Sequence, residues 1–252
     1  MIASLSTTSF NFISTAAIAI GLALIHLSSG LLRFVQVPRS RWLSGAGGVS
    51  VAYVFVHILP ELSEHQTVLE EAENGFIYYL EHHVYLLALL GLTVFYGLEK
   101  MASESRESQE QAGKGNATAQ GVFWIHIASF AIYNALIGYL LMHPEEPDME
   151  NLFLYSLAMG LHFIVNDFGL RENHKHIYDR IGRWILAAAI IVGWVVGSGT
   201  QIGEAIIAVL FAFIAGGIVL NVLKEELPEE RESRFWAFGL GAVIYSALLL
   251  AL

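Results

Sequence analysis

A group of polar side chains interrupts the apolar stretch 152–169. His162 and Asn166 are four residues apart, and Asp167 follows directly. Residues four positions apart lie on one face of a helix, so His162 and Asn166 would point the same way. Imidazole nitrogen together with amide and carboxylate oxygen suits a first-row divalent metal ion. We therefore expect metal ligands here, although Asp167 could instead reach water at the end of the stretch or pair with Arg171.

A second pair of candidate ligands stands at the end of the apolar stretch 42–62. His57 and Glu61 also have the four-residue spacing that places two side chains on one helix face. One face supplies too few atoms for a site of three or four ligands, so we expect both groups to contribute, with this pair at the outer mouth. His26 and His126 are expected to be hydrogen-bonded interior or interfacial residues rather than ligands.

Membrane-spanning helices must position these side chains, because the composition excludes a soluble fold. Of the 252 residues, 55% are apolar or tyrosine and only 14% are charged, and the mean hydropathy is +0.57. Soluble domains carry about 25% charged residues, which coat their surface. The formal charge of −10 argues against a nucleic-acid partner, and the absence of cysteine excludes disulfides and thiolate metal sites. The expected partner is the lipid bilayer.

A helix needs about 20 mainly apolar residues to cross the hydrocarbon core, and the sequence offers eight such segments. Their continuous apolar runs lack the alternation of membrane barrel strands, so all should be helices. The expected spans are 10–32, 42–62, 76–98, 121–141, 152–169, 183–199, 202–223 and 235–252. They form a single all-α transmembrane domain over 1–252. Its longest connection, 99–120, is rich in Ser, Glu and Gly and is expected to be a flexible cytoplasmic loop.

Basic residues occur only in every second connection between these spans. The four groups are Arg33, Arg39 and Arg41; Lys100, Arg106 and Lys114; Arg171, Lys175, Arg180 and Arg183; and Lys224, Arg231 and Arg234. The positive-inside rule places these connections in the cytoplasm and both termini outside. We expect an integral, multi-pass protein of a plasma membrane or a bacterial inner membrane.

Two spans end in the same three residues. Leu59-Pro60-Glu61 closes the second span, and Leu227-Pro228-Glu229 follows the seventh. The charge pattern makes these two spans run in opposite directions, which suggests that helices 1–3 and 6–8 are inverted repeats, an arrangement that places transporter sites near the membrane midplane. Alternatively, proline and glutamate merely mark where each helix ends.

Three segments resemble the ZIP family of metal transporters. The sequence HILPEL at 57–62 is similar to the HLLPE end of the family's second helix. The segment EHHVYLLALLG at 81–91 is similar to the third helix, and 215–229 is similar to the seventh, usually written AGTFLYVALVDLLPE. Eight spans with both termini outside fit the same family. The resemblance implies the ZIP fold of eight transmembrane helices.

Helices 4 and 5 carry the metal ligands of that family, and this sequence differs there. Helix 4 of the family has HNFPEG, where this chain has SFAIYN at 129–134. Helix 5 of the family has HEIPHE, where this chain has HFIVND at 162–167 and keeps the histidine. The resemblance therefore implies a divergent member with an altered metal centre.

By this resemblance the protein is a transporter rather than an enzyme. Its substrate is a divalent metal ion such as zinc, iron or manganese, and it needs no organic cofactor. One alternative is a ZIP-shaped membrane protein without metal transport, which binds, regulates or moves another solute. Another is an intramembrane metallohydrolase that uses zinc-activated water. The chain is also compatible with a homodimer.

Overall fold

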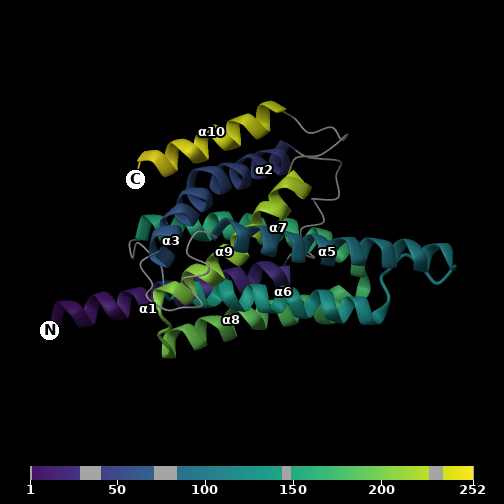
Figure 1. Ribbon diagram of the computed structural model, residues 1–252, viewed down its shortest axis with the longest axis horizontal. Coiled ribbons are helices and arrows are strands. Elements are labelled where there is room, and N and C mark those ends of the chain that lie inside the picture. Colours follow the sequence, from purple (N-terminus) through teal and green to yellow (C-terminus); the bar gives the residue numbers. More distant parts are fainter. Residues whose placement is uncertain (1, 29–40, 71–83, 144–148, 227–234, 252) are drawn as a thin grey trace. The chain divides into compact units, whose positions relative to one another are not determined.

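The computed structural model describes residues 2–28, 41–70, 84–143, 149–226 and 235–251, and within these ranges every regular element is helical. The α-helices are α1 (Ile2–Ser28), α2 (Arg41–Tyr53), α3 (Leu59–Glu70), α5 (Val84–Gln111), α6 (Gln120–Leu140), α7 (Met149–His174), α8 (Arg183–Gly199), α9 (Glu204–Asn221) and α10 (Phe235–Ala251). Three short π-helical turns accompany them: η2 (Val54–Ile58), η3 (Tyr178–Gly182) and η4 (Val222–Glu226). Figure 1 shows their course, and the all-α prediction is confirmed for these ranges.

The helices follow the expected spans wherever the structure describes them. α8 coincides with the span expected at 183–199, and α6 begins and ends one residue before the span expected at 121–141. The span expected at 42–62 is the first part of one longer helical segment, formed by α2, η2 and α3 without a break. The parts of the expected spans at 29–32 and 76–83 lie outside the described residues.

The prediction of a flexible loop over 99–120 is wrong for most of its length. α5 continues through these residues to Gln111, and only 112–119 connects it to α6. The segment is polar, but Glu, Gln, Lys, Arg, Met and Ala are strong helix formers, and this intrinsic preference outweighs the lack of apolar residues. The helix ends at Gln111, and Gly113 two residues later has a φ of 69°, which lets the N–H of Lys114 donate to the carbonyl of Gln109, as in a Schellman cap.

Five of the described helical segments are long and apolar enough to cross a membrane. They are Val84–Gln111, Gln120–Leu140, Leu152–His174, Tyr178–Gly199 and Glu204–Lys224, with shorter apolar helices at Phe12–Ser28 and Phe235–Leu250. Their outer surfaces are apolar as well: Phe153 is 64% exposed and Val243 is 68% exposed. A water-soluble surface does not carry such a density of large apolar side chains, so these surfaces fit a lipid environment.

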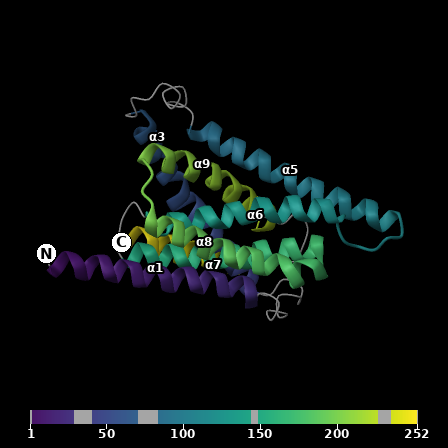
Figure 2. The ribbon, with the colours of Figure 1, turned by 90° about the horizontal axis from the view of Figure 1, so that it is seen from below.

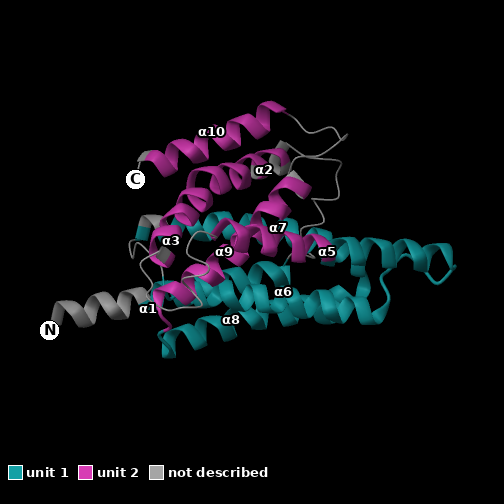
Figure 3. Ribbon diagram, in the orientation of Figure 1, with its two compact units in different colours: residues 1–31, 98–201 teal, residues 32–97, 202–252 magenta. Residues whose placement is uncertain are grey.

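The chain forms two compact units, and each draws helices from distant parts of the sequence. Unit 1 comprises residues 1–31 and 98–201, and unit 2 comprises residues 32–97 and 202–252, as Figure 3 shows. α5 therefore contributes its first half to unit 2 and its second half to unit 1. The single transmembrane domain predicted over 1–252 stays a prediction.

Unit 1 is built on a close pair of helices. α6 and α8 run side by side in the same direction, opposite to α1 and α7 (Figure 2). Gly138 of α6 lies against the carbonyl of Ile190, and Gly193 of α8 lies against the carbonyl of Ala135, so closely that a Cβ atom at either glycine would overlap the neighbouring backbone. Small residues at such contacts let membrane helices approach one another. The closely packed α6 and α8 thus form one side of the polar interior described below.

Unit 2 contains two helix pairs with the same kind of contact. In the first pair, Gly48 of α2 lies against the carbonyl of Phe238 in α10, and Gly241 of α10 lies against the carbonyl of Gly45. No Cβ atom fits at Gly48 or Gly241 unless the backbones move apart. The two helices are thus held together by reciprocal glycine contacts.

The second pair, α5 with α9, repeats this arrangement. Gly216 of α9 lies against the carbonyl of Ala88 in α5, and Gly91 of α5 lies against the carbonyl of Phe213. Gly216 stands 168 residues after Gly48, and Phe213 stands 168 residues after Gly45. On the partner helices, Phe238 stands 150 residues after Ala88, and Gly241 stands 150 residues after Gly91. The close glycine contacts of the two pairs therefore stand at equivalent positions.

The π-helical turns keep the same register. η2 begins at Val54 and η4 begins at Val222, again 168 residues apart, and each precedes a Leu-Pro-Glu sequence. In η2 the N–H of Leu59 donates to the carbonyl of Val54, five residues back. The wider turn gives room to Pro60, which lacks an N–H and would otherwise crowd the carbonyl four residues before it.

These correspondences fit the predicted inverted repeat of the second and third spans with the seventh and eighth, and the repeat itself stays a prediction. α2 and α9 run in opposite directions in Figure 1, as an inverted repeat requires. The residues Leu227-Pro228-Glu229 themselves lie outside the described ranges. The extension of the repeat to helices 1 and 6 stays a prediction.

Candidate functional site

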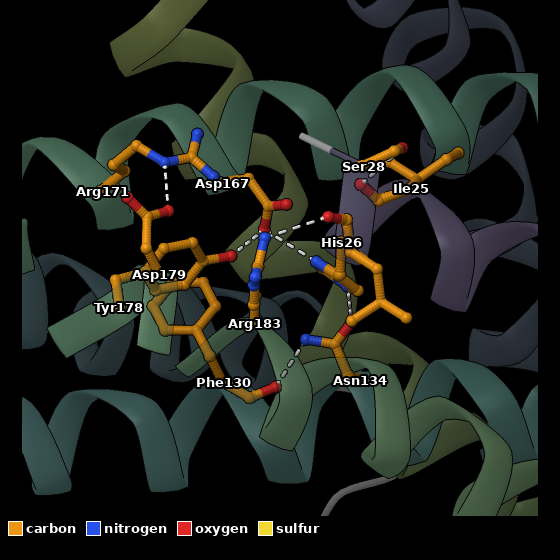
Figure 4. Close-up of polar contacts among 11 residues, drawn as sticks. Ile25, His26, Ser28, Phe130, Asn134, Asp167, Arg171, Tyr178, Asp179 and Arg183 are labelled. Atoms are coloured by element: carbon orange, nitrogen blue, oxygen red, sulfur yellow. Dashed lines mark hydrogen bonds and ion pairs between the residues drawn. The ribbon is translucent and has the colours of Figure 1, made fainter. Parts of the chain in front are cut away.

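The interior of unit 1 holds a hydrogen-bonded group that we call the Asp167 network. Its members are His26 of α1, Asn134 of α6, Asp167 of α7 and Tyr178 of η3, and all four are fully buried. His26 Nδ1 lies 2.7 Å from Asp167 Oδ1, and His26 Nε2 lies 3.0 Å from Asn134 Oδ1. The Tyr178 hydroxyl donates to the same Asp167 oxygen. Figure 4 shows these side chains meeting from four elements.

The hydrogen bond from Asn134 determines the role of one His26 nitrogen. Asn134 Nδ2 donates to the carbonyl of Phe130 at 2.7 Å, which leaves Asn134 Oδ1 as an acceptor for His26. His26 Nε2 must therefore donate, while its Nδ1 faces a carboxylate oxygen. The 2.7 Å contact between His26 Nδ1 and Asp167 Oδ1 is a hydrogen bond and therefore requires one proton between these two atoms. A buried carboxylate is tolerated here because a histidine and a tyrosine compensate it.

Arg171 does not form the ion pair that the sequence offered as an alternative for Asp167. Its Nε donates to Asp179 Oδ1 at 2.8 Å, and its guanidinium lies 5.4 Å from the centre of the Tyr178 ring. The turn η3 brings Asp179 and Tyr178 back toward α7 and supplies a partner to each of the two α7 residues. Asp167 does not reach water either, because it is fully buried. Both alternatives for Asp167 are wrong.

Two polar atoms at the site have no hydrogen-bond partner among the described residues. They are Asp167 Oδ2 and Asn166 Nδ2, which are buried and belong to adjacent residues of α7. A buried polar atom without a partner is uncommon in folded proteins and often marks a place where water or an ion binds. Asp167 therefore keeps an unpaired acceptor oxygen inside unit 1, whereas the unpaired atom of Asn166 is an amide N–H donor, which bonds to an acceptor and not to a metal ion.

His162, the third predicted ligand on α7, has a protein partner of its own. Its Nε2 lies 3.0 Å from the hydroxyl of Tyr133, and both side chains are buried. His162 and Asp167 thus contact different residues. Within the described ranges, no three His, Asp or Glu side chains converge closely enough to hold a metal ion together. The sequence pattern did not suggest Tyr133 or Tyr178 as partners, because tyrosines in apolar spans more often only pack.

His57 and Glu61 pair with each other as their spacing predicts. His57 Nε2 lies 3.4 Å from Glu61 Oε2, and both side chains are partly exposed. The His57 ring also stacks on Tyr53 at 5.0 Å between centroids. Both residues belong to unit 2, whereas the three α7 residues belong to unit 1. The joint action of the two groups stays a prediction.

A second polar group in unit 1 was not predicted as a unit. Glu99 of α5, His126 of α6, His174 of α7 and Thr118 of the 112–119 connection form a chain of contacts. His126 is buried and paired, which confirms that it is an interior polar residue, and the same holds for His26. Glu99 was missed because it was placed in a flexible loop instead of a helix.

These features define a class: an all-helical protein with several helices able to span a membrane and with ionisable side chains in the interior of one helical unit. No protein-family model, curated protein or solved structure matches this chain. The resemblance to the ZIP family therefore rests on the motifs of the chain, and the function below is argued from its residues.

Proposed function

We propose that the protein is a ZIP-like membrane transporter that carries a divalent metal ion, such as zinc, iron or manganese, past Asp167. The observation that carries this proposal is the uncommitted Asp167 Oδ2, a carboxylate oxygen buried within unit 1 with no hydrogen-bond partner in the described part of the chain. Ionisable groups at membrane depth are costly and mark ion or proton pathways. Asp167 is such a group, because it is buried in a unit whose long helices have apolar outer surfaces.

The atoms around Asp167 suit a transient cargo better than a resident ion. Asn166 adds an adjacent amide, and His162 adds an imidazole on the same helix face as Asn166. Carboxylate, amide and imidazole atoms are ligands that first-row divalent ions accept. For Asp167 and His162 a metal ion would compete with a protein partner, Tyr178 for Asp167 and Tyr133 for His162. Conduction requires binding that is weak enough for release, so competition of this kind supports transport.

The test is metal uptake by the full-length protein in liposomes. Purified protein is assayed for flux of Zn²⁺, Mn²⁺, Fe²⁺ and Co²⁺, and for metal bound in detergent. We expect flux of at least one ion, and we expect Asp167→Asn to abolish it while His162→Ala reduces it. Glu104→Gln is the matched control, because Glu104 is an exposed acid on α5 whose carboxylate lies 3.7 Å from the Lys100 ammonium. Absence of both flux and bound metal in the wild-type protein would refute the proposal.

A second candidate is a ZIP-shaped membrane protein without metal transport, with a binding or regulatory role or with another solute as cargo. The partners of Asp167 and His162 favour it, because hydrogen bonds from Tyr178, His26 and Tyr133 already stabilise both side chains. In this case Asp167→Asn would leave the cellular role intact while lowering stability. We propose no enzymatic activity, since the described residues offer no observation that favours a metallohydrolase.

A further inference from the structure

The second polar group of unit 1 is a linear chain of side chains. Glu99 Oε1 lies 3.2 Å from His126 Nε2, His126 Nδ1 lies 2.8 Å from His174 Nε2, and His174 Nδ1 lies 2.6 Å from Thr118 Oγ1. Glu99, His126 and His174 are buried, whereas Thr118 is only half-buried. This row of four side chains therefore leads from the exposed 112–119 connection into the interior of unit 1.

The geometry of the chain excludes a shared metal ion but suits a proton. Each imidazole uses its two nitrogens on opposite sides of the ring, one toward each neighbour. A metal site needs three or four donor atoms aimed at one point, whereas these donors are aimed at one another in sequence. Carboxylate, imidazole, imidazole and hydroxyl in hydrogen-bonding series are groups that accept and pass on protons.

The four side chains of this row can hold their protons in two arrangements. In the first, Thr118 donates to His174 Nδ1, His174 Nε2–H donates to His126 Nδ1, and His126 Nε2–H faces ionised Glu99. If a proton arrives at the Thr118 oxygen, each group passes one proton to the next. In the second state Glu99 carries the proton, and every donor of the first state has become the acceptor. The two states differ by one proton, taken up from water at Thr118.

We propose that Glu99, His126, His174 and Thr118 form a proton relay, in which Glu99 is the buried proton-binding group and Thr118 is the entrance. The relay shares no residue with the Asp167 network, and the proposal stands whether or not Asp167 carries a metal ion. It adds a protonation-dependent function to this end of unit 1.

The contact between Glu99 and His126 is expected to limit proton transfer along the relay. His126 Nε2 lies at ion-pair distance from the carboxylate, but it has no aligned hydrogen bond among the described residues. Proton transfer there needs a small rotation of the carboxyl group, while the two contacts beyond His126 are already hydrogen bonds. Protonation of Glu99 is thus the gated step.

Neighbouring side chains and the backbone hold the members of the relay in place. The rings of Phe123 and Phe130 pack edge-on against His174 and His126, respectively. Thr118 is fixed by its N–H, which donates to the carbonyl of Asn173 at 3.1 Å. On the exposed side, Arg106 of α5 pairs with Glu172 of α7 at 3.3 Å. The other charged groups near this end pair elsewhere, Lys100 with Glu104 and Arg171 with Asp179.

The experiment measures proton uptake by the full-length protein in liposomes after a downward pH jump, with the infrared band of a protonated carboxyl group as the readout. We expect a band that Glu99→Gln removes and that Glu104→Gln on the same helix leaves in place. Thr118→Val removes the entrance hydroxyl with little change in shape. It should slow the rise of the band about a hundredfold, the low end of what a positioned proton-transfer group contributes, and Thr118→Ser should restore it.

Two results would overturn the proposal. One is a carboxyl band that persists in a folded Glu99→Gln variant, and the other is unchanged uptake kinetics in Thr118→Val. If either variant does not fold, ¹⁵N imidazole spectra of the wild-type protein decide the matter. The protonated nitrogens of His126 and His174 must then exchange together with the rise of the band, and fixed tautomers throughout the titration would contradict the relay.

Discussion

Gly48 and Gly216 make the same contact at equivalent positions of two helix pairs, 168 residues apart in the sequence. Each lies against a backbone carbonyl of its partner helix, that of Phe238 for Gly48 and that of Ala88 for Gly216. Each also stands six residues before a π-helical turn. The glycine contacts and the π-helical turns therefore share one register, and the two helix pairs of unit 2 pack in closely similar ways.

Alanine at either glycine should destabilise the protein. An added Cβ would overlap the carbonyl of the partner helix, and the two backbones would have to separate. We expect Gly48→Ala and Gly216→Ala each to cost about 1–3 kcal/mol, the usual range for an overpacked interior, and to cost similar amounts because the contacts are equivalent. Thermal unfolding in detergent measures this.

The partner helices supply matched controls for this prediction. Gly97 of α5 and Gly239 of α10 have open space where a Cβ would stand. Alanine at these positions should leave stability unchanged or raise it by up to about 1 kcal/mol, because alanine is the better helix former. Equal losses in all four variants would show that the close contacts are unimportant.

The hydroxyl of Tyr178 should be worth more than that of Tyr139, although both side chains are buried. Tyr178 donates to the carboxylate of Asp167, whereas the Tyr139 hydroxyl has no hydrogen-bond partner in the described part of the chain. We expect Tyr178→Phe to lower the free energy of unfolding by about 2 kcal/mol, because hydrogen bonds to charged groups contribute about 1.5–3 kcal/mol. Tyr139→Phe should be neutral or slightly stabilising. Equal effects in thermal unfolding would argue that Asp167 does not depend on Tyr178.

The helices and the local pairs were predictable from the sequence because both depend on neighbours along the chain. Continuous apolar runs located α6 and α8 to within one residue. The pairing of His57 with Glu61 follows from the four-residue spacing alone. The prediction of a loop over 99–120 was wrong because it rested on polar composition. In a run of Glu, Gln, Lys and Arg, the helix propensity of these residues is the stronger signal.

The partners of the buried polar residues were not predictable from spacing. His26 and Asp167 are 141 residues apart, and His126 and His174 are 48 residues apart. Only the packing of α1, α6 and α7 in one unit brings them together. The sequence did indicate that His26 and His126 would be hydrogen-bonded, because burying a polar group without a partner is costly. The sequence did not indicate which residues would be their hydrogen-bond partners.

The folded protein should become less stable as the pH falls, because His65 is harder to protonate in the folded chain than in the unfolded chain. This residue of α3 lies beyond the span expected at 42–62, and its ring packs on Phe211 at 4.6 Å between centroids. Burial lowers the pKa of His65 from 6.5 to about 4. Between these two pH values the unfolded chain binds a proton that the folded chain does not bind. The free energy of unfolding therefore decreases as the pH falls from 6.5 toward 4, by at most about 3 kcal/mol.

The variant His65→Leu isolates this contribution. Leucine keeps an apolar side chain against Phe211 but binds no proton, so the variant should lose less stability than the wild-type protein between pH 6.5 and 4.5. The measurement is the difference between the two unfolding curves at each pH, which cancels the titration of the carboxylates common to both proteins. Above pH 6.5 the difference should be constant, because His65 is then neutral in both the folded and the unfolded chain. A constant difference over the whole range would show that His65 is protonated as readily in the folded protein as in the unfolded one.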